Sequence, residues 1–189
     1  MEEYDLTEYP KDSKKIRFLF IGRIMKEKGV DELFEAARSI KKIYPNVIFD
    51  IVGPMEDDYK EIIQSLMEKG IIYYHGYQED VKPFIEKSHC FVLPSYHEGM
   101  ANTLLEAGAM GRPLITSRIH GCMEAVEDGK NGYLVNIRDA KDLELKLKDF
   151  IETEYKTKKR MGQASRRRME TIFDKKIVVR KTMEGLSLK

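Results

Sequence analysis

The chain has 189 residues, and its hydrophobic content of 42% supports one ordinary domain with a substantial core and argues against disorder. No uncharged apolar run reaches about eighteen residues, so we expect no membrane-spanning helix. Residues 1–15 are acidic and polar, unlike the basic and apolar leader of a secreted protein. Cys90 and Cys122 lack the clustering of a disulfide framework or zinc site, which predicts a reduced, cytoplasmic protein.

The formal net charge of +1 conceals a basic C-terminal segment. Residues 151–189 contain twelve Lys or Arg and five Asp or Glu. Two interpretations account for this segment, a solvated helix face and a peripheral contact with an anionic membrane surface. Aromatic residues for base stacking are scarce there, so we expect no nucleic-acid partner.

Six runs rich in apolar and β-branched residues predict strands at residues 16–24, 47–53, 71–77, 90–95, 113–117 and 132–136. Segments of helical period lie between them at residues 31–44, 59–69, 81–87 and 102–110. Buried strands that alternate with helices predict a parallel sheet covered on both faces. The expected fold class is α/β, with a Rossmann-like, doubly wound, parallel sheet of six strands.

After residue 136 the pattern changes to helices, which we expect at residues 140–152, 155–171 and 175–184. The only linker-like stretch is residues 1–15, which contain Pro10 and few apolar residues. We therefore divide the chain into a linker at 1–15, one domain at 16–172 and a C-terminal helix at 173–189.

The first predicted strand leads into a turn, residues 22–29, that precedes a helix. Ligands of open α/β sheets bind at the carboxyl edge of the strands, where a helix N-terminus attracts anions. Gly22 allows close approach to the backbone, and Arg23 and Lys28 can contact phosphate oxygens. Ordinary surface cations would give the same pattern. The absence of G-x-G-x-x-G and Walker patterns argues against a dinucleotide dehydrogenase and a P-loop ATPase.

Two carboxylates, Glu98 and Glu106, flank the junction between the loop after the fourth strand and the next helix, whose expected N-cap is Asn102. At the sheet edge both could accept hydrogen bonds from sugar hydroxyls. The alternative is that Glu106 is an exposed helix residue and that Glu98 is a favourable charge near the start of a helix. A glycosidase also uses two carboxylates, but it leaves Arg23 and Lys28 without a role.

These motifs resemble those of the family 4 retaining glycosyltransferases. The spacing of Glu98 and Glu106 is similar to the E-x7-E signature of that family, and residues 107–116 resemble its usual continuation. Gly22-Arg23 followed by Lys28-Gly29 is similar to its phosphate turn. The resemblance implies that the chain is the donor-binding, C-terminal half of a GT-B fold. Its ends would then connect to, and pack toward, an N-terminal half.

The resemblance also implies roles for individual residues. Arg23 and Lys28 would hold the diphosphate and offset the charge that develops as the sugar–phosphate bond breaks, and Glu98 would bind the transferred sugar. The remaining donor contacts would come from Gly22, from Tyr77 in a turn that frames the base, from the backbone of Gly99, Met100 and Ala101, and from the Glu106 carboxylate at the ribose hydroxyls.

Two further segments, residues 121–124 and 128–135, resemble the G-x-x-E and D-G-x-N-G-x-L-V segments of the family. Cys122 replaces the usual second glycine and Arg118 the usual acidic residue, departures that bear on the identity of the sugar more than on the chemistry. No D-x-D motif and no His or Cys cluster with metal spacing occurs. We therefore expect metal-independent chemistry without a cofactor.

The resemblance implies transfer of a hexose-type sugar from a UDP-sugar, or another nucleotide-diphosphate sugar, to a glycan or lipid-linked acceptor. Surface polysaccharide synthesis, such as that of a capsule, with peripheral contact at the inner membrane face, is the implied setting. Alone, the chain is expected to bind nucleotide with little turnover. Two rivals remain: a GT-B nucleotide-sugar epimerase, and a non-enzymatic α/β signalling module, which needs a phosphoacceptor Asp where this chain has Gly22-Arg23.

Overall fold

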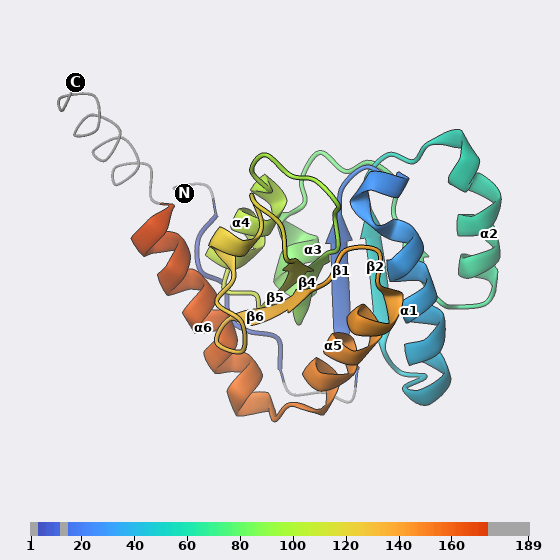
Figure 1. Ribbon diagram of the computed structural model, residues 1–189. Helices are drawn as coiled ribbons and strands as arrows, with labels where there is room; N and C mark the ends of the chain where they lie inside the picture. Colours follow the sequence, from blue (N-terminus) through green and yellow to red (C-terminus); the bar gives the residue numbers. More distant parts are fainter. Residues whose placement is uncertain (1–3, 12–14, 174–189) are drawn as a thin grey trace, which may run out of the picture.

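The computed structural model describes residues 4–11 and 15–173, which form a sheet of six parallel strands covered by helices (Figure 1). The strands are β1 (Arg17–Ile21), β2 (Ile48–Val52), β3 (Tyr73–Tyr74), β4 (Cys90–Leu93), β5 (Leu114–Ser117) and β6 (Gly132–Val135). Their order across the sheet is β3-β2-β1-β4-β5-β6. The predicted doubly wound, six-stranded parallel sheet is confirmed. Each strand is shorter than its predicted run because the flanking residues enter turns and loops.

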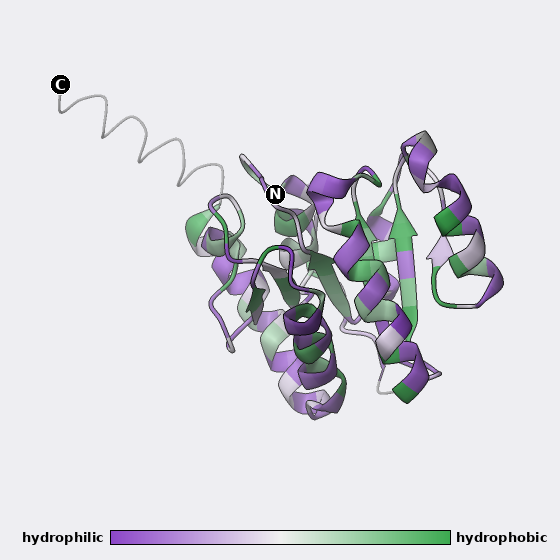
Figure 2. Ribbon diagram, turned by 45° about the vertical axis from the view of Figure 1, so that its right-hand side comes forward, coloured by the Kyte–Doolittle hydropathy of each residue, from purple (hydrophilic) through white to green (hydrophobic). Residues whose placement is uncertain are grey.

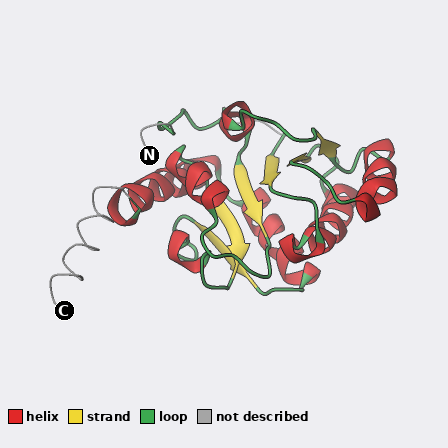
Figure 3. Cartoon of the chain, turned by 90° about the horizontal axis from the view of Figure 1, so that it is seen from above, coloured by secondary structure: helices red, strands yellow, loops and turns green. Residues whose placement is uncertain are grey.

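The α-helices are α1 (Val30–Ile43), α2 (Lys60–Glu68), α3 (Lys82–Lys87), α4 (Asn102–Ala109), α5 (Ala140–Glu152) and α6 (Tyr155–Ile172). Three short 3-10 helices are η1 (Lys26–Lys28), η2 (Asp57–Tyr59) and η3 (Met123–Ala125). Helix α1 packs against α5, and α4 packs against α6. Figure 1 shows α1 and α5 in front of the strands and α3 behind them, and Figure 3, seen from above, shows helices on both sides of the sheet.

The core forms where the apolar stripes of the helices meet the strands. Phe18 of β1 stacks on Phe49 of β2, with 5.2 Å between ring centroids, and lies 5.7 Å from Phe150 of α5. All three are buried, and each such side chain contributes about 1.5–3 kcal/mol by leaving water. Helix α1 buries Leu33, Phe34, Ala37 and Ile40, which lie on one face of the helix. Figure 2 shows the strands as mainly hydrophobic and the helices as amphipathic.

Residues 4–11 are fastened to the domain by Arg112, which is fully buried. Its guanidinium donates to the Thr7 hydroxyl, to the Glu8 carbonyl at 3.1 Å and to the Ile85 carbonyl at 2.8 Å. Tyr9 adds a hydrogen bond of 2.9 Å from its hydroxyl to the carbonyl of His89. The role of residues 1–15 as a linker stays a prediction, and the helix expected at 175–184 lies outside the described residues.

Candidate functional site

The sheet order places β1 beside β4 in the middle of the sheet, and the chain winds outward from this pair in opposite directions. Such a switch point leaves a crevice at the carboxyl ends of the two strands, where open α/β sheets bind ligands. The turn with Arg23 and Lys28 follows β1, and the loop with Glu98 follows β4. The two segments that the sequence singled out therefore lie at one place in the fold.

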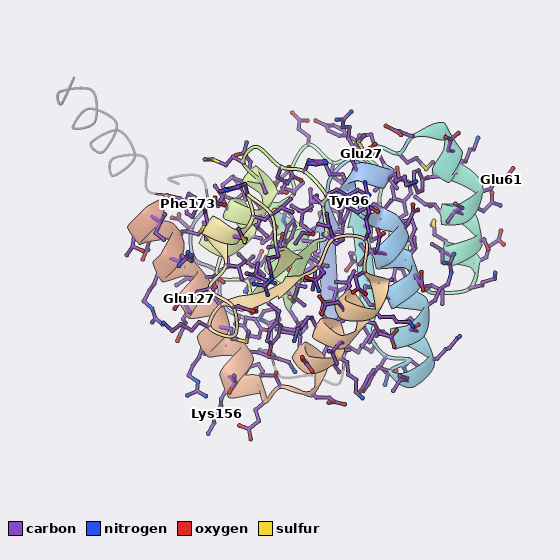
Figure 4. The ribbon with its side chains drawn as sticks, viewed as in Figure 1. Glu27, Glu61, Tyr96, Glu127, Lys156 and Phe173 are labelled. Atoms are coloured by element: carbon purple, nitrogen blue, oxygen red, sulfur yellow. The ribbon has the colours of Figure 1, made fainter. Side chains whose placement is uncertain are left out.

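Glycine at position 29 permits the two loops to touch. Its backbone is left-handed, with φ of 67°, and a Cβ added there would lie 2.0 Å from the carbonyl oxygen of Pro94. Beside this contact the Tyr96 amide donates to the Glu27 carbonyl at 2.8 Å. Figure 4 labels Glu27 and Tyr96 near one another in its upper part. Any residue larger than glycine at this point would separate the loops.

An ion pair joins the predicted diphosphate-binding and sugar-binding residues. The Lys28 ammonium lies 2.7 Å from Oε1 of Glu98, and the Ser95 hydroxyl donates to the same oxygen at 2.7 Å. The side chains of Lys28 and Glu98 are 23% and 10% exposed, so the pair is screened less than one on the open surface. A lysine has three N–H donors, so Lys28 can keep Glu98 and still donate to an added phosphate.

Tyr96 fixes the loop after β4 to its neighbours. It is buried, and its hydroxyl donates to both carboxylate oxygens of Glu32, in the first turn of α1, at 2.7 and 2.8 Å. Burial and the Glu32 carboxylate raise the pKa of Tyr96, so the hydroxyl stays protonated. The guanidinium of Arg138 lies over the Tyr96 ring, 5.0 Å from its centroid. The loop is thus fixed to α1 on one side and to the segment after β6 on the other.

The loop after β5 lies against the loop after β4, which carries Glu98. At Gly121, with φ of 81°, a Cβ would lie 2.3 Å from the Glu98 carbonyl, so these backbones also touch. The Gly121 amide donates to the Glu124 carboxylate at 2.9 Å. Backbone hydrogen bonding, together with His120, lowers the pKa of Glu124. Burial raises the pKa of the Cys122 thiol to about 11, with the Glu98 carboxylate adding to the rise, so Cys122 is a neutral neighbour of the ion pair.

The other predicted contact residues differ in exposure. Arg23, Gly99 and Met100 are exposed at the end of the sheet, Ala101 is buried, and Gly22 and Glu106 are partly buried. Tyr77, after β3, is 72% exposed and belongs to the same edge. Whether these residues bind a donor stays a prediction.

The expected N-cap at Asn102 is wrong. Helix α4 has Ala101 as its N-cap, without a side-chain hydrogen bond, and Asn102 is the first helical residue. Two contacts fix the loop before the chain enters α4: the Ser95 hydroxyl donates to Glu98, and Gly121 lies against the Glu98 carbonyl. The helix therefore begins at Asn102, one residue earlier than expected, and the Asn102 side chain is not at the capping position. The amides of the first turn of α4 are consequently not occupied by a side-chain cap.

Sequence reasoning missed three side chains that shape this edge. Nothing in the sequence assigns a role to Ser95 or Tyr96. Asp50 gave a usable signal, because it is a lone charge inside the apolar run of β2, and it is 3% exposed. In the described part of the chain, no group of three or more His, Cys, Asp or Glu side chains could hold a metal ion. No described helix is long and apolar enough to cross a membrane.

Comparison with known families decides the assignment. The model of the family described as "Glycosyl transferases group 1" matches residues 2–168. The chain belongs to this family. Proteins with related sequences include an N-acetylgalactosaminyltransferase of Campylobacter jejuni that acts on N,N'-diacetylbacillosaminyl-diphospho-undecaprenol, 29% identical over 90% of this chain and 44% of that protein. The capsular polysaccharide glycosyltransferase CapM of Staphylococcus aureus is 28% identical over 84% of this chain and 42% of its own length.

Solved structures of glycosyltransferases share the fold of this group 1 chain. HepE of Anabaena, in complex with UDP and glucose, has a TM-score of 0.79 at 21% identity over 93% of this chain and 49% of HepE. The C-terminal domain of the group 1 protein LpcC of Francisella tularensis has a TM-score of 0.75 at 23% identity over 88% of this chain and 96% of that domain. The prediction of one GT-B half is confirmed. The chain spans less than half the length of the curated relatives it matches.

Proposed function

We propose that this group 1 domain binds the nucleotide-diphosphate sugar of a family 4, retaining glycosyltransferase, with a UDP-sugar as the donor. The observation that carries the proposal is the Lys28–Glu98 ion pair at the switch point of the sheet. It places a cation suited to phosphate beside a carboxylate suited to sugar hydroxyls, and a sugar bonded to a diphosphate needs both.

The chemistry of the proposal follows from charge. As the sugar–phosphate bond breaks, negative charge grows on the leaving diphosphate. Lys28, Arg23 and the N-terminus of α1 would face that charge, and Glu98 would hold the transferred sugar. Glu106 would bind the ribose hydroxyls, and the backbone of Gly99, Met100 and Ala101 would approach the sugar or distal phosphate. In this scheme the reaction needs no metal ion.

The wider setting is also part of the proposal. HepE binds UDP and glucose, and the Campylobacter relative acts on a lipid-linked acceptor, which supports transfer of a hexose-type sugar to a glycan or lipid-linked acceptor. CapM supports a role in surface polysaccharide synthesis, such as that of a capsule. The acceptor would be bound by an N-terminal half, which the relatives have room for in their longer chains.

We place the enzyme in the cytoplasm, with peripheral contact at the inner membrane face. The exposed residues of α6 include Lys156, Lys159, Arg160 and Arg167. A row of cations on one helix face attracts anionic lipid headgroups. Cosedimentation with vesicles that contain about 30% phosphatidylserine, but not with neutral vesicles, is the expected result. Equal recovery with both would remove the membrane part and leave donor binding untouched.

The proposal is tested by calorimetric titration of this chain with UDP, GDP and ADP in the presence of EDTA. We expect selective binding of UDP that Arg23→Ala and Glu106→Ala both weaken. In a transferase assay with a complete enzyme, Arg23→Ala should lower the rate by about 10² to 10³ with little effect on stability. Absence of binding to all three nucleotides would contradict donor binding by this chain. Net inversion of the donor sugar without any acceptor would favour an epimerase.

A further inference from the structure

A buried carboxylate lies on β2, one strand away from the candidate site. Asp50 of β2 is 3% exposed and interrupts an otherwise apolar strand. Arg17 of β1 pairs with its Oδ2, and Nε2 of His75 lies 2.8 Å from its Oδ1. Because an ionised carboxylate can only accept, the His75 nitrogen carries the hydrogen and donates. Asp50 thus joins β1 to the residue that follows β3.

An apolar side chain at position 50 would pack in the strand without the cost of burying a charge. The Asp50 carboxylate therefore has a role beyond packing. Its partner His75 indicates what that role is. His75 stands at the end of β3, where the chain turns, and its ring packs against Phe84 of α3 with 4.9 Å between centroids. Two different elements, β2 and α3, consequently fix the orientation of the imidazole.

The turn after His75 is tied to the sheet through its backbone. The His75 amide donates to the Ile51 carbonyl at 2.9 Å, and the Gly76 carbonyl accepts from the Gly53 amide at 2.8 Å. The Gln78 side chain donates to the His75 carbonyl at 2.7 Å. Two backbone hydrogen bonds thus join the turn to β2 and Gly53, Gln78 closes the turn on itself, and Asp50 adds a side-chain contact with His75.

The outer side of this turn is open. No atom lies within 4 Å of the position that a Cβ of Gly76 would occupy, and Tyr77 exposes 72% of its surface. Gly53 lies against the Gly22 carbonyl, so the ends of β1, β2 and β3 are in register along one edge. Strands are about 4.8 Å apart, which places the turn about 10 Å from the phosphate turn. A nucleotide spans a comparable distance from its phosphates to its base.

We propose that Asp50 is a positioning residue for the base of the bound nucleotide, acting through His75 to hold the Gly76–Tyr77 turn. The proposal rests on the nucleotide binding proposed above. The exposed Tyr77 ring supplies a flat aromatic surface on which a base can stack, and the fixed backbone supplies hydrogen-bonding groups. Arg17 acts one step further away, by pairing with the Asp50 carboxylate and so orienting it.

The test separates base binding from phosphate binding. Calorimetry would compare UDP with inorganic diphosphate on the unmodified chain, on Asp50→Asn and on His75→Phe, which keeps an aromatic ring against Phe84. We expect about tenfold weaker binding of UDP in both variants and unchanged binding of inorganic diphosphate, because His75→Phe loses the hydrogen bond to Asp50 and Asp50→Asn loses the carboxylate charge that Arg17 and His75 share. Amide hydrogen exchange at residues 75–78 should rise in both variants, while that of β5 stays the same.

The control is Ser165→Ala, which removes a buried hydroxyl that donates to the Asn131 carbonyl. Asn131 precedes β6, at the opposite edge of the sheet from β3. It should leave the ratio of the UDP and diphosphate affinities unchanged. Equal weakening of both ligands in Asp50→Asn, or no weakening of either, would overturn the positioning role while donor binding stands. If the unmodified chain binds neither ligand, the proposed function fails and this role fails with it.

Discussion

Lys28 and Glu98 are 70 positions apart in the chain, and their side chains meet at 2.7 Å between the ends of the two central strands. The pair gives Glu98 a second polar partner beside Ser95 and holds the Lys28 ammonium against the Glu98 carboxylate. A charge held in place before the ligand arrives loses less conformational freedom on binding. The free domain therefore already has its two principal polar groups in position.

Lys28→Met removes this cation and keeps a side chain of similar length. We expect UDP to bind at least about tenfold more weakly, because a charge-assisted contact with the diphosphate is lost. Stability should fall by only about 1 kcal/mol, since Glu98 keeps its hydrogen bond with Ser95. Calorimetry gives the affinity and urea unfolding gives the stability.

The matched control is Lys26→Met, which removes an exposed cation of the same turn that has no assigned role. It should bind UDP within about twofold of the unmodified chain. If the two variants lose the same affinity, a general attraction between the turn and anions explains the loss, and the assignment of Lys28 is wrong.

Gly29→Ala should destabilise the domain by about 3 kcal/mol, from a left-handed backbone and a Cβ placed against the Pro94 carbonyl. Gly70→Ala separates the cost of the left-handed backbone from the cost of the contact with the Pro94 carbonyl. Gly70 has φ of 64°, close to the 67° of Gly29, but no atom lies within 4 Å of its Cβ position. We expect Gly70→Ala to cost about 1 kcal/mol in urea unfolding. Equal losses for the two variants would mean that the contact between the loops contributes nothing to stability.

Much of the fold could be predicted because strand runs and helical stripes differ in period. The stripe of α1 and the run of β4 carry this signal clearly. Edge strand β3 does not, since only Tyr73 and Tyr74 pair with a neighbouring strand and the rest of the predicted run forms turns. The described α-helices were predicted to within about two residues, which is the ordinary uncertainty of helix ends, whereas η1 and η3 were not predicted.

From the residues alone, the candidate site could be predicted only as two separate loops, and it was the family resemblance that implied one donor between them. The order of strands brings Lys28 to Glu98, and the strand order is set by packing of the whole chain rather than by either motif. The start of α4 was misassigned for the same reason, because contacts of Ser95 and Gly121 fix the loop before Asn102 can cap it. Asp50 was overlooked because its two partners come from other elements, Arg17 from β1 and His75 from the turn after β3.

Acid should destabilise the domain through His89. Its burial, with the nearby charge of Lys158 adding, lowers the pKa of the imidazole from 6.5 to about 4. Between these two values the unfolded chain binds more protons than the folded one, so the free energy of unfolding falls as the pH falls. The contribution is at most about 3 kcal/mol. Urea unfolding between about pH 7.5 and pH 4.5 measures it.

His89→Gln should reduce this dependence on pH, because an amide oxygen can accept from the Arg17 amide as Nδ1 of His89 does at 3.1 Å. The control is His97→Gln, which changes an exposed histidine and should leave the dependence as it was. A slope that is the same in His89→Gln as in the unmodified chain would show that other groups cause the acid sensitivity.

Arg112→Leu should release the segment at residues 4–11 from the domain. Burial lowers the pKa of the guanidinium to about 10, so it is still charged at neutral pH and its hydrogen bonds are charge-assisted. Its loss leaves the carbonyls of Ile85 and Glu86 without this donor, and we expect a loss of about 3 kcal/mol in urea unfolding. Chymotrypsin should also cleave more rapidly after Tyr4 and Leu6.

Arg167→Leu, at an exposed position on α6, is the matched control and should change neither measurement. Unchanged cleavage in Arg112→Leu would show that Tyr9 and the apolar contacts hold the segment without the arginine.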